Sequence, residues 1–65
     1  MNHNEYLTSS QVAAKTGYSQ RTIIRMADDG TIPSAYVWRT LRGRHRRFDP
    51  AIVTWLIRLR EEGYV

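Results

Sequence analysis

Residues 8–29 read TSSQVAAKTGYSQRTIIRMADD, and this stretch decides the fold. Gln11 stands three residues after Thr8, which is the spacing of a capping box, so a helix is expected to begin here and to continue to Thr16. Gly17 follows at the position where a left-handed residue commonly ends a helix. The stretch is therefore predicted to form two short helices joined by a tight turn.

The second of these helices is predicted from Gln20 to about Asp29. Ser19 is placed to cap its first turn, and Gly30 is placed to end it. Residues three and four apart share a face of a helix. One face then carries Thr22, Ile23, Met26 and Ala27, and the other carries Arg21, Ile24, Arg25 and Asp28. The first face is expected to be core, and the second is expected to be available to a ligand.

Residues 35–48 have the character of a β-hairpin, which we call the wing. Aromatic and β-branched side chains favour a strand over residues 35–39, Gly43 permits a turn, and residues 46–48 are expected to return as the second strand. Residues 40–47 read TLRGRHRR. A charge run of this kind is usually a solvated loop, but at the tip of a hairpin it is also suited to reach phosphate.

A last helix is predicted over residues 50–62, with Asp49 as its cap and Pro50 at its first position. Its apolar side chains cover a wider arc than an ordinary surface helix needs. The spacing of Val53, Leu56 and Ile57 favours the core, which leaves Trp55 and Leu59 as candidate contacts to another protein. The alternative is that this small domain uses every apolar side chain of the helix to cover its core.

The 65 residues are expected to form one domain, preceded by an N-terminal arm over residues 1–6. Ten basic residues face six acids, and the net charge of +4 indicates a phosphate-rich partner, although charge alone is weak evidence. The chain has no cysteine, and His3 and His45 are too few for a zinc site, so no metal or cofactor is expected. No signal peptide or membrane-spanning run is seen, which favours a cytoplasmic location.

No carboxylate pair, no nucleophile with an adjacent base and no phosphate-binding loop occurs in the sequence. We therefore expect no catalytic residue and no enzyme activity.

The segment YLTSSQVAAKTGYSQRTIIRMADDGTIP, followed by HRRFD, resembles the small excisionase-type and MerR-type DNA-binding domains over roughly residues 6–57. The positions that carry this resemblance are Leu7, Thr8, Val12, Ala13, Gly17, Ser19, Thr22, Ile23, Arg25, Gly30, Ile32, Pro33, Arg46, Arg47 and Phe48. The resemblance implies a winged helix-turn-helix fold, mainly α-helical with a small β-hairpin. Two departures matter: Ile24 stands where the family often has a basic or polar residue, and the wing is longer and richer in arginine than a minimal one.

The resemblance also implies a function. The chain is expected to be a DNA-bending accessory protein of a phage or mobile element, an excisionase (recombination directionality factor) that directs an integrase towards excision. A small MerR-like transcriptional regulator is the alternative. A basic protein-interaction module that binds no DNA is the candidate from a different class, and a steep salt dependence of DNA binding would argue against it.

The candidate DNA-binding residues are Ser19, Gln20, Arg21 and Arg25 of the second helix and Arg42, Arg44 and Arg46 of the wing. Arginine pairs with guanine and glutamine with adenine in the major groove, where the second helix of a helix-turn-helix docks. The alternative is that Arg21 and Arg25 are solvent-exposed surface residues that pair with Asp28 and Asp29.

In the wing, Arg42 and Arg44 flank Gly43 and are expected to enter a narrow minor groove. Arg46 is expected to contact phosphate, with His45 beside it, while Arg47 alternates to the opposite face and is expected to pair with an acid. A domain of this size reads only a short site, so copies are expected to bind DNA side by side.

Overall fold

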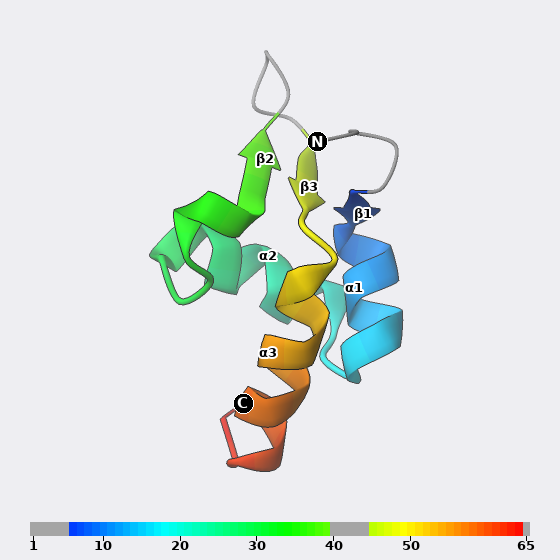
Figure 1. Cartoon of the computed structure of the whole chain (residues 1–65), viewed down its shortest axis with the longest axis vertical. Coiled ribbons are helices and arrows are strands. Elements are labelled where there is room, and N and C mark those ends of the chain that lie inside the picture. Colours follow the sequence, from blue (N-terminus) through cyan, green and yellow to red (C-terminus); the bar gives the residue numbers. More distant parts are fainter. Residues whose placement is uncertain (1–5, 40–44, 65) are drawn as a thin grey trace.

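The computed structural model describes residues 6–39 and 45–64 of the chain. Figure 1 shows a small sheet at one end of the molecule, with the helices packed beneath it and the last helix running to the other end. The elements in chain order are β1 (Leu7–Thr8), α1 (Ser9–Thr16), α2 (Gln20–Asp29), the short 3-10 helix η2 (Ser34–Tyr36), β2 (Val37–Arg39), β3 (Arg46–Phe48) and α3 (Ala51–Glu61). This is a winged helix-turn-helix arrangement, as the sequence predicts.

The capping box of α1 is present as expected. The Thr8 hydroxyl accepts a hydrogen bond from the Gln11 amide at 3.1 Å, and the Gln11 side chain accepts one from the Thr8 amide at 2.9 Å. Helical geometry already begins at Ser9, directly after the cap. At the other end Gly17 has φ = 86°, a left-handed conformation that costs glycine little. Local chemistry therefore sets both ends of α1.

α2 also begins and ends as predicted. The Ser19 hydroxyl accepts a hydrogen bond from the Thr22 amide at 3.1 Å, and Gly30 closes the helix. Ile23, Met26 and Ala27 are buried, while the side chains on the opposite face, Arg21, Arg25 and Asp28, are exposed. The amphipathic pattern thus correctly separates the core face of α2 from its outer face.

The sheet has three strands in the order β1-β3-β2, all antiparallel. The third strand was not expected: Leu7 pairs with Phe48 and Thr8 with Arg47, so the residues just before α1 extend the wing. The strand expected over residues 35–39 is also shorter, since it begins at Val37. Pro33 starts the 3-10 turn that replaces its first part, and the Tyr36 amide donates to the Pro33 carbonyl at 3.0 Å.

α3 begins at Ala51, one residue later than expected, and ends at Glu61. Pro50, predicted at the first helical position, stands at the N-cap position, and the Asp49 carboxylate before it accepts a hydrogen bond from the Ala51 amide at 2.9 Å. The Asp49 amide donates to the Tyr36 carbonyl at 2.9 Å, which ties the start of α3 to η2. No helix in the described part of the chain is long and apolar enough to span a membrane.

One core is formed between the helices and the inner face of the sheet. Its buried apolar residues are Val12, Tyr18, Ile23, Met26, Ala27, Ile32, Phe48, Ile52 and Leu56. The prediction for α3 was wrong in part: Ile52 and Leu56 face the core, Val53 is half-buried, and Ile57 is 38% exposed. Leu56 was predicted correctly, but the helix is rotated so that Ile52 and not Ile57 is buried with it. The apolar arc of α3 is too wide for the sequence to fix which side of the helix faces the core.

Candidate nucleic-acid interface

The outer face of α2 presents two arginines to solvent. Arg21 makes no ion pair with any described residue, and Arg25 lies 3.9 Å from the carboxylate of Asp29, one turn further on. Both partners of that pair are about half exposed, with side-chain exposures of 54% and 43%. Exposed pairs of this kind contribute little to stability and exchange readily for another anion. Both candidate DNA-binding arginines of this face are therefore accessible from solvent.

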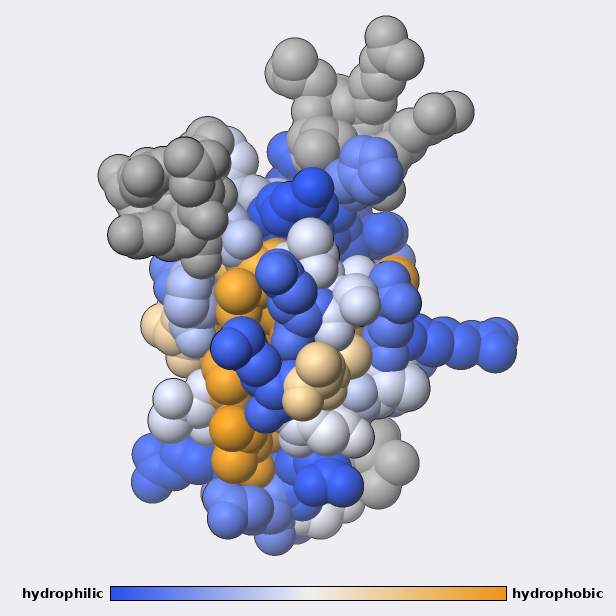
Figure 2. Space-filling model, turned by 90° about the vertical axis from the view of Figure 1, so that its right-hand side faces the viewer, coloured by the Kyte–Doolittle hydropathy of each residue, from blue (hydrophilic) through white to orange (hydrophobic). Residues whose placement is uncertain are grey.

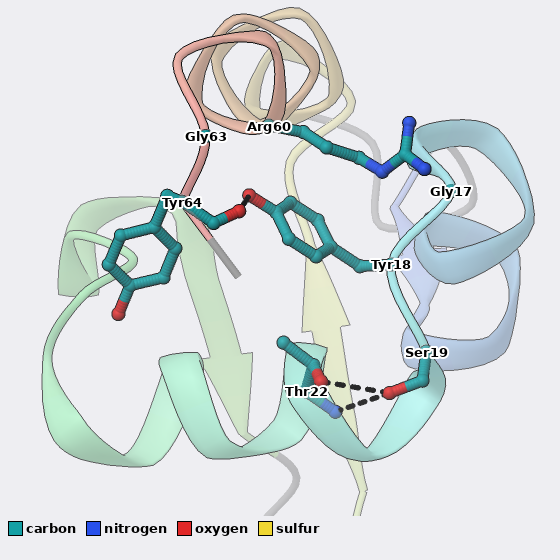
Figure 3. Close-up of a pocket in the computed structure, with 7 residues that line it drawn as sticks. All are labelled: Gly17, Tyr18, Ser19, Thr22, Arg60, Gly63 and Tyr64. Carbon is teal, nitrogen blue, oxygen red and sulfur yellow. Dashed lines mark hydrogen bonds between the residues drawn. The ribbon is translucent and has the colours of Figure 1, made fainter.

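The N-terminus of α2 lies close to that of α1. The Gln20 side-chain amide donates to the Ser9 hydroxyl at 3.1 Å, across the two helices. The Ser19 hydroxyl is used twice within α2, since it accepts from the Thr22 amide and donates to the Thr22 hydroxyl at 2.8 Å (Figure 3). The Ser19 hydroxyl is therefore engaged in capping α2, and the Thr22 amide has an acceptor in Ser19.

Asp28 of α2 is bound by two arginines of the wing. Arg39 Nη2 donates to Asp28 Oδ1 at 3.0 Å, while Arg46 donates through Nε to Oδ1 and through Nη2 to Oδ2, each at 3.0 Å. We call these three residues the Asp28 cluster. The hydrogen bond from Arg39 holds the pKa of the Asp28 carboxyl below its ordinary value, and Arg46 acts in the same direction. The cluster joins the C-terminal turn of α2 to both β2 and β3.

The Asp28 cluster changes the expectations for the wing arginines. The acid partner that was predicted for Arg47 belongs to Arg46, because Arg46 and Arg39 face each other on the inner side of the sheet. Arg47 instead donates to the carbonyl oxygen of Arg46 at 3.1 Å. The phosphate contact expected of Arg46 would compete with Asp28 for the same guanidinium. His45 is exposed, and Arg42 and Arg44 lie outside the described residues.

Arg39 was not among the functional residues predicted from the sequence. One signal was available: a hairpin register centred between residues 42 and 43 pairs Arg39 with Arg46, as the structure does. Two arginines directly opposite each other repel, so the pairing itself calls for an acid nearby. That Asp28 is this acid follows only from the placement of α2 against the wing.

The outer face of the sheet carries an aromatic pair. The Trp38 indole donates to the Tyr6 hydroxyl at 2.8 Å, and the two rings meet edge to face with centroids 6.0 Å apart. Trp38 remains 46% exposed. Tyr6, which was predicted to be part of a simple N-terminal arm, therefore packs against β2.

An open groove of roughly 570 Å³ lies between the helix-turn-helix and the end of α3. Figure 3 shows the Tyr18 ring between α2 and α3, and the Arg60 side chain extended towards Gly17. The Tyr18 hydroxyl donates to the Tyr64 carbonyl at 2.7 Å, which fastens the chain after α3 to the turn. Desolvation raises the pKa of Tyr18, and the nearby charge of Arg60 partly opposes this shift.

The outer side of α3 was the candidate for contact with another protein. Trp55 is 39% exposed, whereas Leu59 is half-buried and packs against the core. The two residues line a shallow depression with Arg58 and Glu62. Hydrophilic side chains cover most of the face in Figure 2, and the apolar surface forms a narrow lengthwise strip. Trp55 is the more accessible of the two candidates.

Within residues 6–39 and 45–64 no group of acidic or histidine side chains is arranged to hold a metal ion. The geometry is that of a winged helix-turn-helix protein, with a capped second helix and a basic wing beside it. In a comparison with protein families, residues 6–54 match the helix-turn-helix domain family. The match spans most of the chain, so the chain belongs to this family, whose fold serves to bind double-stranded DNA. No curated protein and no solved structure matches the chain.

Proposed function

We propose that this chain is a sequence-preferring accessory protein that binds and bends duplex DNA, and that it acts as an excisionase directing an integrase towards excision. The observation that carries the DNA-binding part is the exposed outer face of α2, which presents Arg21 and Arg25 and whose last turn contacts the wing through Asp28. The excisionase role is supported by the resemblance of the sequence to excisionase-type domains. In this proposal the protein uses no catalytic residue and no cofactor, and it is a cytoplasmic protein associated with the nucleoid.

In this proposal α2 is the recognition helix and lies in the major groove. Arg21 and Arg25 contact base edges or phosphates, because their side chains project from the face opposite the core. Gln20 stands on the flank that faces α1, where its side-chain amide donates to Ser9 and keeps its carbonyl oxygen and second N–H for DNA. The amides near Ser19 hold a phosphate of the groove edge.

The wing enters the adjacent minor groove through Arg42 and Arg44. A narrow minor groove has an enhanced negative potential that attracts arginine, and a duplex that bends towards the protein lets the helix and the wing bind adjacent grooves together. Arg46 supports the wing from β3 and approaches phosphate only if Asp28 releases it. Groove insertion on one side of the recognition helix is the source of the proposed bend.

Protein contacts are assigned to α3. Trp55 is a large aromatic side chain exposed on the outer side of this helix, and aromatic residues are enriched in the centres of interfaces. Leu59 adds apolar surface at its edge. Through this surface neighbouring copies contact one another on DNA, and an integrase is the second partner.

The test begins with footprinting on the DNA that flanks the gene. Protection of repeated sites next to a recombination attachment site is the expected result, and protection across a promoter would favour the MerR-like regulator instead. Bending is then measured by circular permutation of the protected site in a gel-mobility assay. Excision of a plasmid-borne attachment pair by the neighbouring integrase should require the protein.

The Arg21→Ala/Arg25→Ala double variant tests the role of α2, because it removes the positive charge of the outer face and leaves the core residues unchanged. It should lose protection, bending and excision together. Full excision with this variant would contradict the proposed role of α2. Binding that does not weaken as salt is raised would contradict DNA recognition through phosphates and favour a protein-interaction module.

A further inference from the structure

A single carboxylate connects the recognition helix to both strands of the wing. Asp28 lies in the last turn of α2, and it accepts hydrogen bonds from Arg39 of β2 and from Arg46 of β3. The contact with Arg46 is bidentate, through Nε and Nη2, each at 3.0 Å. A bidentate contact between two planar groups fixes their relative orientation as well as their distance. Asp28 therefore constrains the direction of β3 relative to α2.

The surroundings of the Asp28 cluster strengthen this constraint. Arg39 and Arg46 are directly opposite each other in the strand register, where two like charges repel unless an anion lies between them. The Arg46 side chain is only 21% exposed, against 44% for Arg39 and 45% for Asp28, so Arg46 is the partner that the surrounding structure holds most firmly. The inner face of the wing thus depends on this one acid for its charge balance.

An acid at this place is unexpected for a DNA-binding surface. It belongs to the same face of α2 as Arg21 and Arg25, and its negative charge opposes the approach of phosphate. It also stands near the C-terminal end of a helix, where the helix dipole disfavours a negative charge. The role of Asp28 is therefore expected to lie in its hydrogen bonds to Arg39 and Arg46 of the wing.

We infer that Asp28 is a positioning residue for DNA sequence selection, an inference that rests on the proposed DNA-binding function. The Asp28 cluster holds the wing at one angle to α2, so that base contacts by the helix and groove contacts by the wing form together on one DNA site. Without Asp28 the wing still attracts phosphate, but it no longer selects the sequence that satisfies both contacts at once. Asp28 thus lowers general affinity for DNA and raises discrimination between sites.

Asp29 is a matched control for this role. It is the next residue of α2, is exposed and carries the same charge. Its partners are the Thr31 amide, the Thr31 hydroxyl and Arg25, and none of them belongs to the wing. Removal of either acid changes the net charge equally. Removal of Asp29 also frees Arg25 from a 3.9 Å contact between half-exposed groups, but only removal of Asp28 releases the wing.

The experiment uses the full chain as wild type, Asp28→Asn, Asp29→Asn and Asp28→Glu. A preferred duplex is first selected with the wild-type protein from a randomised pool. The Kd is then measured on that duplex and on a scrambled duplex of equal length, over a series of salt concentrations. The ratio of the two Kd values reports discrimination, and the slope of log Kd against log salt reports phosphate contacts.

Asp28→Asn should reduce the ratio at least about fivefold, the loss expected when one base-specific contact is no longer formed. Its affinity for the scrambled duplex should stay the same or rise. Its salt slope should grow by up to roughly 0.9 for each released arginine that reaches a phosphate. Asp29→Asn should keep the wild-type ratio, and Asp28→Glu should restore part of it, because a carboxylate is again within reach of the wing.

A wild-type ratio in Asp28→Asn, or an equal loss in Asp29→Asn, would overturn the inference. A cooperative thermal unfolding transition and wild-type core amide resonances establish that the variants compared are folded at the assay temperature. The Arg46 Nε–H resonance follows the ion pair without DNA, and the inference also fails if Asp28→Asn leaves that resonance unmoved. A wild-type protein that prefers no duplex from the pool would instead contradict the proposed function itself.

Discussion

Replacement of Arg25 by alanine separates the contribution of this side chain to the fold from its contribution to DNA binding. In the free protein its ion pair with Asp29 spans 3.9 Å between half-exposed groups. Such a pair, four residues apart on an exposed helix face, contributes little to stability. Arginine and alanine are both strong helix formers, so the helix itself is little affected. The variant should therefore unfold within a few degrees of the wild type.

The effect on binding should be much larger. A bidentate contact between arginine and a base is worth about 1–3 kcal/mol, which corresponds to a Kd about 5- to 150-fold weaker. Gel-shift titration of the Arg25→Ala variant on a footprinted site measures this loss. Arg58 of α3 is the matched control, because it is exposed, carries the same charge and lies outside α2.

Equal Kd values for Arg25→Ala and Arg58→Ala would refute the assignment of α2 as the recognition helix. Losses that are equal but large would mean that total charge, and not position, governs binding. The difference between the two variants is thus the informative quantity, since both lower the net charge by one.

Further predictions concern stability and assembly. Tyr18→Phe should lower the free energy of unfolding by about 0.5–1.5 kcal/mol in urea titration, because it removes one hydrogen bond to the backbone after α3 and keeps the buried ring. Gly17→Ala should cost about 1–2 kcal/mol in the same assay, since φ is 86° and a Cβ there would lie 3.0 Å from the Arg60 guanidinium carbon. The pKa of Asp28 in the folded protein lies below its ordinary value of 3.8, so the ionised carboxylate should stabilise the fold above pH 3.8. This stabilisation should be lost as the pH falls through the folded-state pKa, and the difference in melting temperature between wild type and Asp28→Asn should vanish at that low pH. Trp55→Ala should leave binding to a single site unchanged and reduce cooperative filling of adjacent sites, which sedimentation of the DNA complexes measures; undiminished cooperativity would exclude this face as the contact between copies.

The sequence by itself determined the helix boundaries of the helix-turn-helix. Thr8 and Gln11 cap each other across three residues, Ser19 caps the helix that follows it, and Gly17 and Gly30 take left-handed conformations. These interactions are local, so they can be read from spacing without knowledge of the fold. The amphipathic pattern of α2 is equally local and separates its buried face from the face that carries the candidate DNA contacts.

Only the tertiary structure decided the features that join distant segments. β1 is two residues long, too short for a periodic pattern, and exists because β3 supplies its hydrogen-bonding partner. The rotation of α3 about its axis was set by packing of Ile52 and Leu56 against the other core residues, since the wide apolar arc of the helix is compatible with several rotations. Asp28 meets Arg39 and Arg46 across 11 and 18 residues of sequence, because the fold brings the last turn of α2 within side-chain reach of β2 and β3. Side-chain charge was evident in the sequence, but the choice of partner depended on the approach of elements that no local rule describes.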